Sequence, residues 1–278
     1  MSLFIASLNS GSNGNCYYVG NNHEAVLIDA GISCREIEKR MSNLNLSIQK
    51  VKAVFISHEH IDHIRGIEAL SKKFNLPVFI TRATLANSKL RLADYLVKSF
   101  QEKQTINIGV LAITPFAKHH DAADPFSFMV EGNKVKIGVI TDIGKVCEQV
   151  KYYFNQCHAS FLESNYDEQM LENGNYPIHL KNRIRKGKGH LSNTQALELF
   201  VNHRPSFMSH LILSHLSNNN NTPEIVHNLF KKHAGKTKII IASRTTETVV
   251  YSITQSGKNE NSNLKTIEKN KTLQLSLF

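Results

Sequence analysis

The stretch SHEHIDH, residues 57–63, is the densest group of metal-binding side chains in the 278-residue chain. It follows an apolar, β-branched run at residues 51–56, which predicts a strand. His58 and His60 are two residues apart, so at a strand end both side chains can face one point. The Asp–His pair that follows brings the stretch to three imidazoles and one carboxylate, a donor set that suits borderline metals such as zinc or manganese.

The four donors His58, His60, Asp62 and His63 are more than one tetrahedral ion needs if it must keep an open position for substrate. We therefore expect two divalent metal ions to share them. The alternative is a histidine-rich surface turn, which is how a lone HxH is best interpreted. The complete HxHxDH pattern after a strand resembles the signature of the metallo-β-lactamase fold, an α/β four-layer αββα sandwich. The resemblance implies that the first two histidines bind one metal and the Asp–His pair the other.

Two metal ions need further ligands, and the downstream sequence offers them in order. Residues 118–126, KHHDAADPF, supply His119 and His120. Asp142 ends a predicted strand at 135–141 and suits a bridging carboxylate, and His215 ends another at 211–213. Each of these residues alone is more often a polar residue of the surface or core. Together they complete a two-metal set.

The rest of the chain predicts one α/β domain over residues 1–254. Further strands are expected at 3–8, 16–19, 25–29, 111–116, 126–130, 159–162, 239–242 and 248–253. Three helix starts carry capping signals: Ser33 with Glu36, Ser192 with Gln195, and Thr222 before Pro223. The segment 255–278 is predicted to be a flexible polar tail with an apolar end.

Composition argues for a cytoplasmic protein that meets no membrane. No run approaches 18 apolar residues, and the start of the chain has no basic segment followed by a long apolar one. The four cysteines form no CxxC pair, so we expect reduced thiols. The formal net charge of +10 favours polyanionic partners, of which nucleic acid is the commonest.

Several segments together resemble the YycJ (WalJ) family of metallo-β-lactamase-fold proteins over about residues 3–253. They are LNSGSNGNCYYV (8–19), LIDAG (27–31), HDAADP (120–125), LESNYD (162–167), GHLSN (189–193) and LSHLSNNNN (213–221). The resemblance implies a metal-dependent DNA exonuclease of 5′ to 3′ direction with a role in repair. The sequence departs from the family pattern at two positions, neither of which is a predicted ligand. Ser127 stands where the family often has Gly, and Tyr166 stands where it often has His.

The resemblance also selects His120 over His119, because in the family the histidine before Asp–Ala is the ligand. The expected ligands of one ion are then His58, His60 and His120, and those of the other are Asp62, His63 and His215, with Asp142 between them.

The candidate catalytic residues are Asp62, Asp142, Glu163 and His190. Asp142 would hold the bridge between the metals. A poor alkoxide leaving group needs a proton, which a histidine that is not a ligand can supply. Related phosphodiesterases of the fold use such a histidine with a carboxylate behind it, and the resemblance therefore implies an acid pair of His190 with Glu163. The alternatives for His190 are a further metal ligand or a capping residue.

A basic segment precedes His190 and carries Lys181, Arg183, Arg185, Lys186 and Lys188. It is either a solvated face or a patch that follows DNA phosphates beside the active site, and its position favours the patch.

The last five residues, QLSLF, resemble the pentapeptide with which bacterial repair proteins dock on the sliding clamp. Gln274 would make polar contacts, and Leu275, Leu277 and Phe278 would enter an apolar cleft. A flexible tether would raise the effective concentration of the nuclease at DNA. The alternative is a last strand of the domain's own sheet.

Three other functions share most of these features: an RNA-processing nuclease of the same fold, a small-molecule phosphodiesterase or thioester hydrolase, and a DNA- or clamp-binding regulator without activity. The tail argues for DNA over RNA. The basic segment and tail disfavour a small substrate, and the complete ligand set argues against an inactive regulator.

Overall fold

The computed structural model describes residues 2–256, and these form two seven-stranded sheets. The first sheet has the order β14-β1-β2-β3-β4-β5-β6, with β3 to β6 parallel and the other pairs antiparallel. Its strands are β1 (Leu3–Asn9), β2 (Cys16–Gly20), β3 (Ala25–Ile28), β4 (Val51–Phe55), β5 (Val78–Phe79), β6 (Val97–Lys98) and β14 (Tyr251–Ile253).

The second sheet has the order β13-β12-β11-β10-β9-β8-β7, with β10 to β13 parallel. Its strands are β7 (Ile106–Ile108), β8 (Leu111–Ala117), β9 (Phe126–Gly132), β10 (Val135–Ile140), β11 (Ala159–Glu163), β12 (His210–Ser214) and β13 (Lys238–Ile241). The central strands β11 and β12 are buried throughout, which explains why their sequences are apolar without alternation.

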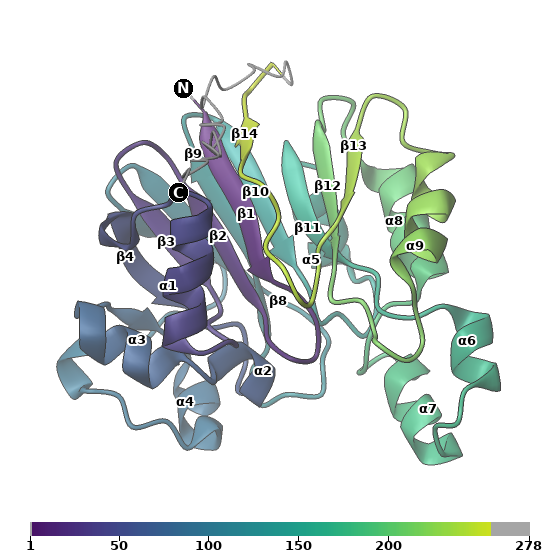
Figure 1. The fold of residues 1–278 in the computed structure, drawn as a ribbon, viewed down its shortest axis with the longest axis horizontal. Helices are drawn as coiled ribbons and strands as arrows, with labels where there is room; N and C mark the ends of the chain where they lie inside the picture. Colours follow the sequence, from purple (N-terminus) through teal and green to yellow (C-terminus); the bar gives the residue numbers. More distant parts are fainter. Residues whose placement is uncertain (1, 257–278) are drawn as a thin grey trace, which may run out of the picture.

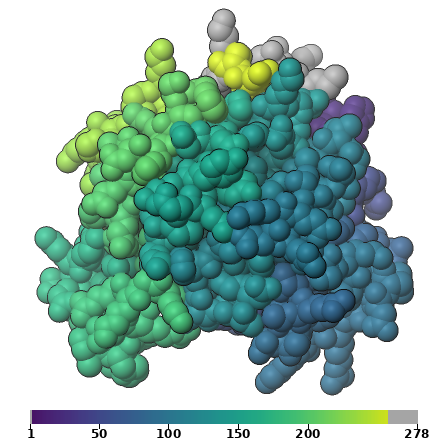
Figure 2. Space-filling model, turned by 180° about the vertical axis from the view of Figure 1, so that it is seen from behind, coloured from purple at the N-terminus to yellow at the C-terminus, as the bar shows by residue number. Residues whose placement is uncertain are grey.

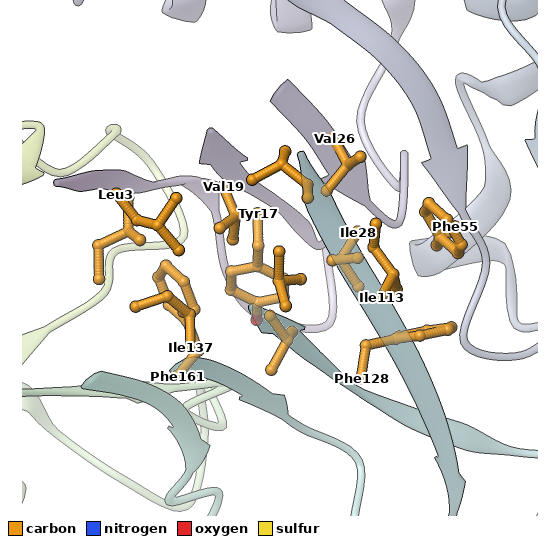
Figure 3. Close-up of a cluster of buried hydrophobic side chains, with 14 of the residues drawn as sticks. Leu3, Tyr17, Val19, Val26, Ile28, Phe55, Ile113, Phe128, Ile137 and Phe161 are labelled. Atoms are coloured by element: carbon orange, nitrogen blue, oxygen red, sulfur yellow. The ribbon is translucent and has the colours of Figure 1, made fainter. Parts of the chain in front are cut away.

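The core between the sheets is built from side chains that alternate along the strands. Leu3, Tyr17 and Phe55 from the first sheet meet Phe128 and Phe161 from the second, as Figure 3 shows. Tyr17 lies against Phe161 with ring centroids 4.9 Å apart. Burial of apolar area on this scale is the main term that holds two sheets face to face.

Helices cover the outer face of each sheet (Figure 1). Apolar side chains of α1 and α3 pack on the first sheet, and those of α5, α8 and α9 pack on the second. The helices are α1 (Cys34–Asn43), α2 (Ile61–Ile64), α3 (Ile67–Phe74), α4 (Arg82–Ser88), α5 (Glu148–Phe154), α6 (Glu168–Asn173), α7 (Ile178–Arg185), α8 (Asn193–His203) and α9 (Pro223–Lys231), with 3-10 turns at Ile48–Lys50 and Asp94–Leu96. The predicted four-layer αββα sandwich is confirmed.

The capping signals in the sequence start the expected helices. Ser192 and Gln195 form a reciprocal capping box before α8, Ser33 accepts a hydrogen bond from the backbone of Glu36 before α1, and Thr222 caps α9. The short strands β5, β6 and β7 and the helices α3 to α7 lie outside the predicted elements, although Thr81 caps α4 and Asp167 caps α6 in a similar way. The tail peptide with Gln274, Leu275, Leu277 and Phe278 lies outside the described residues.

Two helical lobes extend beyond the sheets at one end of the molecule. Helices α3 and α4 form one lobe and α6 and α7 the other, at the lower left and lower right of Figure 1. Figure 2 shows the same lobes in blue and green from behind, with the molecular surface indented between them. The loops that follow β4, β8, β10 and β12 open into the space between the lobes.

Candidate metal centre

The candidate site lies where strands of both sheets end. His58 follows β4 of the first sheet, whereas His120, Asp142 and His215 follow β8, β10 and β12 of the second. Ligand sites of parallel α/β sheets form at the carboxyl ends of strands because loops from neighbouring strands meet there. Residues far apart in the chain are therefore brought to one point.

Three imidazoles form the first group of donors. His58 Nε2 lies 3.1 Å from His60 Nδ1, which in turn lies 3.3 Å from His120 Nε2. Burial lowers the pKa of His58 well below its usual value and that of His120 to about 3. Both imidazoles are therefore neutral at physiological pH and have a free lone pair for a metal. His119 is exposed and is in no donor group of the described residues.

The second group contains carboxylates. His215 Nε2 lies 3.5 Å from Asp62 Oδ2 and 3.4 Å from Asp142 Oδ1. On the opposite side, Asp142 Oδ2 lies 3.4 Å from His63 Nε2. Asp142 thus spans the space between two histidines, and Asp62, His63 and His215 form one compact donor set.

The carboxylates of this second group create a site that favours positive charge. Burial alone would lower the pKa of His63, but the surrounding carboxylates, Asp142 foremost, raise it to about 10. The same balance between burial and carboxylates, again led by Asp142, raises the pKa of His215. A divalent cation would supply that positive charge.

The donor chemistry also fits a cation. Asp142 Oδ2 and His215 Nε2 are both buried, and neither has a hydrogen-bond partner in the described part of the chain. Buried polar atoms without partners are uncommon and call for an explanation such as a bound ion. Clusters of His and Asp in this arrangement are typical of a dinuclear metal site.

Polar groups behind the ligands fix their orientation. Asp29 Oδ2 accepts a hydrogen bond from His63 Nδ1 at 2.7 Å, and the carbonyl oxygen of Gly189 lies 2.9 Å from His120 Nδ1. Glu163 Oε1 lies 3.4 Å from His215 Nδ1. Such partners hold the opposite ring nitrogen toward a metal and strengthen its basicity.

Two of the polar residues at the site had no predicted role. Asp29 is fully buried and also accepts hydrogen bonds from the backbone and side chain of Ser57. Asn15, equally buried, places its Nδ2 3.1 Å from His63 Nε2 and 3.3 Å from Asp62 Oδ2. The available signal was a polar residue directly after an apolar run, as in the segment LIDAG.

Glu163 and His190 lie against the second group. Glu163 Oε1 is 2.7 Å from His190 Nδ1, and its Oε2 accepts backbone hydrogen bonds from Ile143 and Leu191. Burial would raise the pKa of Glu163, but its histidine neighbours, His190 first, lower it to about 2. The pair is therefore an ionised, fixed carboxylate behind a partly exposed imidazole.

A cleft of about 240 Å³ opens over the donors. Its walls include His60 and His190 from the site and Tyr176, Leu180 and Arg183 from the lobe formed by α6 and α7. A small molecule or the end of a polymer could enter from this side.

The side chains of the basic segment do not form one continuous patch, because they have different surroundings in the structure. Arg183 lines the cleft and pairs with Asp121, while Arg185 pairs with Glu172 on its own lobe. Lys181 is buried and donates a hydrogen bond to the backbone carbonyl of Glu172, so its charge does not face a phosphate. Lys186 and Lys188 are exposed.

Comparison with known proteins now identifies the family. The model of the beta-lactamase superfamily domain matches residues 24–215. Exodeoxyribonuclease YycJ of Bacillus anthracis is 33% identical over 234 residues, which cover 81% of this chain and 86% of that protein. Exodeoxyribonuclease WalJ of Streptococcus pneumoniae is 31% identical over 225 residues, 79% of this chain and 84% of that protein. The chain belongs to the YycJ/WalJ family of the β-lactamase superfamily.

Solved structures show how widely the fold of this YycJ/WalJ member is shared. Zn(2+)-bound PqqB from Methylobacterium extorquens superposes with a TM-score of 0.68 at 15% identity, over 88% of this chain and 99% of that one. Human tRNase Z, short form, gives a TM-score of 0.61 at 14% identity, over 88% of this chain and 98% of that one. At such identities the likeness shows the fold alone.

Family, fold and donor clusters together define a metallo-β-lactamase-fold hydrolase that depends on metal. Among residues 2–256, no helix has the length and apolar character needed to cross a membrane.

Proposed function

We propose that this protein is a two-metal phosphodiesterase that degrades DNA from an end, in the 5′ to 3′ direction. The observation that carries the proposal is the convergence of seven His and Asp donors from both sheets beside one open cleft, which five of them line. DNA as the substrate is supported by the two relatives named exodeoxyribonucleases, which are matched over 86% and 84% of their lengths.

In this proposal His58, His60 and His120 would hold one ion, Asp62, His63 and His215 would hold the other, and Asp142 would serve both. When bound, a pair of divalent ions activates water at neutral pH and neutralises charge that develops on the phosphoryl oxygens. Zinc suits the imidazoles, and manganese suits the carboxylates and nuclease chemistry.

The chain's own residues orient the reacting groups. The Asp142 carboxylate faces His63 with one oxygen and His215 with the other, so it can fix both halves of the centre at once. Asp62 lines the cleft on the same side.

His190 is placed to protonate the leaving oxygen. Its Nδ1 is committed to Glu163, which leaves Nε2 as the atom that exchanges protons with a substrate in the cleft. Glu163 keeps the ring oriented, a property that a general acid needs.

Digestion of end-labelled DNA and RNA with zinc, manganese or magnesium supplied tests the proposal. We expect shortening of DNA from the 5′ end and loss of activity in Asp142→Asn and His63→Ala. Preference for RNA would replace DNA as the substrate class, and unchanged activity in both variants would refute the two-metal site.

We also propose that Gln274, Leu275, Leu277 and Phe278 dock the enzyme on the sliding clamp, and that it acts in the cytoplasm in DNA repair or replication. The support is the sequence of the tail and the DNA enzymes among the relatives. A pull-down with purified clamp, comparing the full chain with one that ends at Lys271, tests the docking. Equal capture of both chains would refute it.

A further inference from the structure

A second cavity, of about 550 Å³, adjoins the metal cleft. Its wall includes Ser10, Ser217, Asn218, Thr222, Arg244 and Thr245. Ser217 also lines the metal cleft, and it lies two residues after the donor His215. The two cavities therefore share a wall at the metal centre.

Three loops that are distant in the sequence form this second cavity, and direct hydrogen bonds lock them together. Ser10 donates its backbone N–H to the carbonyl of Ser243 at 3.1 Å, and Asn13 donates its side-chain amide to the carbonyl of Arg244 at 2.7 Å. The backbone N–H of His215 donates to Ser10 Oγ at 2.8 Å. The cavity is thus held in a fixed position relative to a metal-binding residue.

Arg244 supplies the unsatisfied positive charge of this cavity. The residue is half-buried, and its Nη1 has no hydrogen-bond partner among residues 2–256. None of the ion pairs formed within those residues includes Arg244. Glu224 lines the same cavity but is exposed at the rim. By contrast, Arg183 and Arg185 are both paired with carboxylates. Arg244 lines the cavity and is half-exposed, so its positive charge is available to an anionic group bound there.

The remaining lining has an apolar part, with Leu216, Pro223 and Ile241, and a polar part that favours a phosphate group over a base. Ser217, Thr222 and Thr245 offer hydroxyls and Asn218 an amide, the groups that commonly accompany arginine in contacts to phosphate. The lining contains no aromatic side chain on which a base could stack.

We propose that this cavity binds a phosphate of the DNA strand next to the scissile one, with the Arg244 guanidinium as its ionic partner. The inference rests on the proposed nuclease function and adds a second anchoring point to it. A strand held at both points lies across Ser217, which sets the scissile phosphate over the metal donors. The phosphate is either the terminal 5′ group or one inside the strand, and the substrates of the test distinguish these sources.

The test compares the whole protein with its Arg244→Gln variant on 5′-phosphorylated and 5′-hydroxyl oligonucleotides and on bis(p-nitrophenyl) phosphate, which has no second phosphate. We expect KM for DNA to rise on the order of tenfold in the variant, as for loss of one charged hydrogen bond. Hydrolysis of the small diester and the metal content should stay unchanged. An effect only on 5′-phosphorylated DNA assigns the cavity to the terminal group, and an equal effect on both ends assigns it to an internal phosphate.

Arg35→Gln is the matched control, because it removes one exposed positive charge on α1 that lines neither cavity. Direct binding of the same oligonucleotides, measured by fluorescence anisotropy against salt, separates this inference from the proposed function. Arg244→Gln should reduce the slope of log Kobs against log salt by about 0.7, and Arg35→Gln should not. Unchanged DNA binding and KM in Arg244→Gln would overturn the inference while the nuclease proposal stands. Failure of the native protein to cleave DNA would overturn the nuclease proposal instead.

Discussion

Three residues of the metal centre lie on left-handed backbone. The φ angles are 61° at Asp29, 56° at Asp142 and 57° at His215, and each residue comes within two positions of the end of a parallel strand. This conformation costs about 1–2 kcal/mol for an L-residue with a side chain. Glycine would relieve the strain but would remove the carboxylate or imidazole, so the strain is retained where the chemistry needs these side chains.

At the residue scale, we predict that His190→Gln lowers kcat for DNA by roughly 10²- to 10⁴-fold, the usual contribution of a general acid. The kcat of the variant for bis(p-nitrophenyl) phosphate should fall far less, because the nitrophenolate of this substrate leaves without needing a proton. Glu163→Gln should reproduce the pattern in weaker form. Steady-state kinetics on both substrates and the metal content of each variant check this. If the His190→Gln variant bound fewer metal ions than the native protein, His190 would instead be identified as a metal ligand.

A second residue-scale prediction concerns Asp29. Replacing it by Asn keeps an acceptor near His63 Nδ1 but removes the charge, so metal affinity should fall by about 10- to 100-fold. Competition with a chelator of known affinity measures this. The exposed Asp94→Asn is the control, and an equal loss in both variants would contradict a specific role of Asp29.

Metal binding should also depend on pH. In chelator-treated protein His63, with its pKa raised to about 10, carries a proton at pH 7, whereas His120, with its pKa near 3, does not. A cation must displace the proton on His63, so affinity should rise as the pH increases from 6 to 8, by up to about tenfold per pH unit for each proton released. Calorimetry in buffers of different ionisation enthalpy counts the protons, and a count of zero would contradict the prediction.

At the scale of elements, glycine allows the loop after β3 to approach the metal-binding stretch. A Cβ on Gly31 would lie 1.6 Å from the carbonyl oxygen of Asp62 and 2.6 Å from the backbone nitrogen of Asn15. Asn15 in turn donates its backbone N–H to that same carbonyl at 2.7 Å. The loop after β1, the loop after β3 and helix α2 therefore depend on one another at this point.

We accordingly predict that Gly31→Ala lowers the free energy of unfolding by about 1–3 kcal/mol, as overpacking does, and weakens metal binding through displacement of Asp62. Chemical denaturation and metal titration measure the two effects. Lys39→Ala, at an exposed position of α1, should change stability by no more than about 0.5 kcal/mol. Native metal affinity in Gly31→Ala would show that the close approach is not needed for the site.

At the scale of the whole molecule, the candidate metal centre lies where the two sheets meet. One sheet supplies His58, His60, Asp62 and His63, and the other supplies His120, Asp142 and His215. A cation bound to both halves stabilises the folded state by mass action, about 4.1 kcal/mol when its concentration is 1,000 times Kd.

Chelation should therefore lower Tm by on the order of 10 °C, since 1 kcal/mol shifts a chain of this size by about 2–4 °C. Differential scanning calorimetry with and without chelator measures the shift, and added metal should reverse it. Asp142→Asn should respond less than the native protein. An equal Tm with and without metal would argue that the ions do not join the sheets.

The metal donors could be predicted from the sequence because they belong to local patterns. In SHEHIDH the backbone geometry of a strand end and turn places neighbouring side chains together whatever surrounds them, and His120, Asp142 and His215 each follow a recognisable apolar run. The likeness to a family then ordered these segments around one site. The proposed substrate class came from that likeness and from the QLSLF tail, since ligands of a hydrolytic metal centre do not encode what it cleaves.

Only the tertiary structure decided the contacts between residues distant in the chain. Asp29 meets His63 across 34 positions, and Arg244 meets the loop at Asn13 across 231. The basic segment shows the same limit, because the fold buries Lys181, turns Arg183 into the cleft and pairs Arg185 with Glu172. Composition determines that such a segment is positively charged. Which of its charges face a substrate depends on packing against neighbouring elements, and the local sequence does not contain those distances.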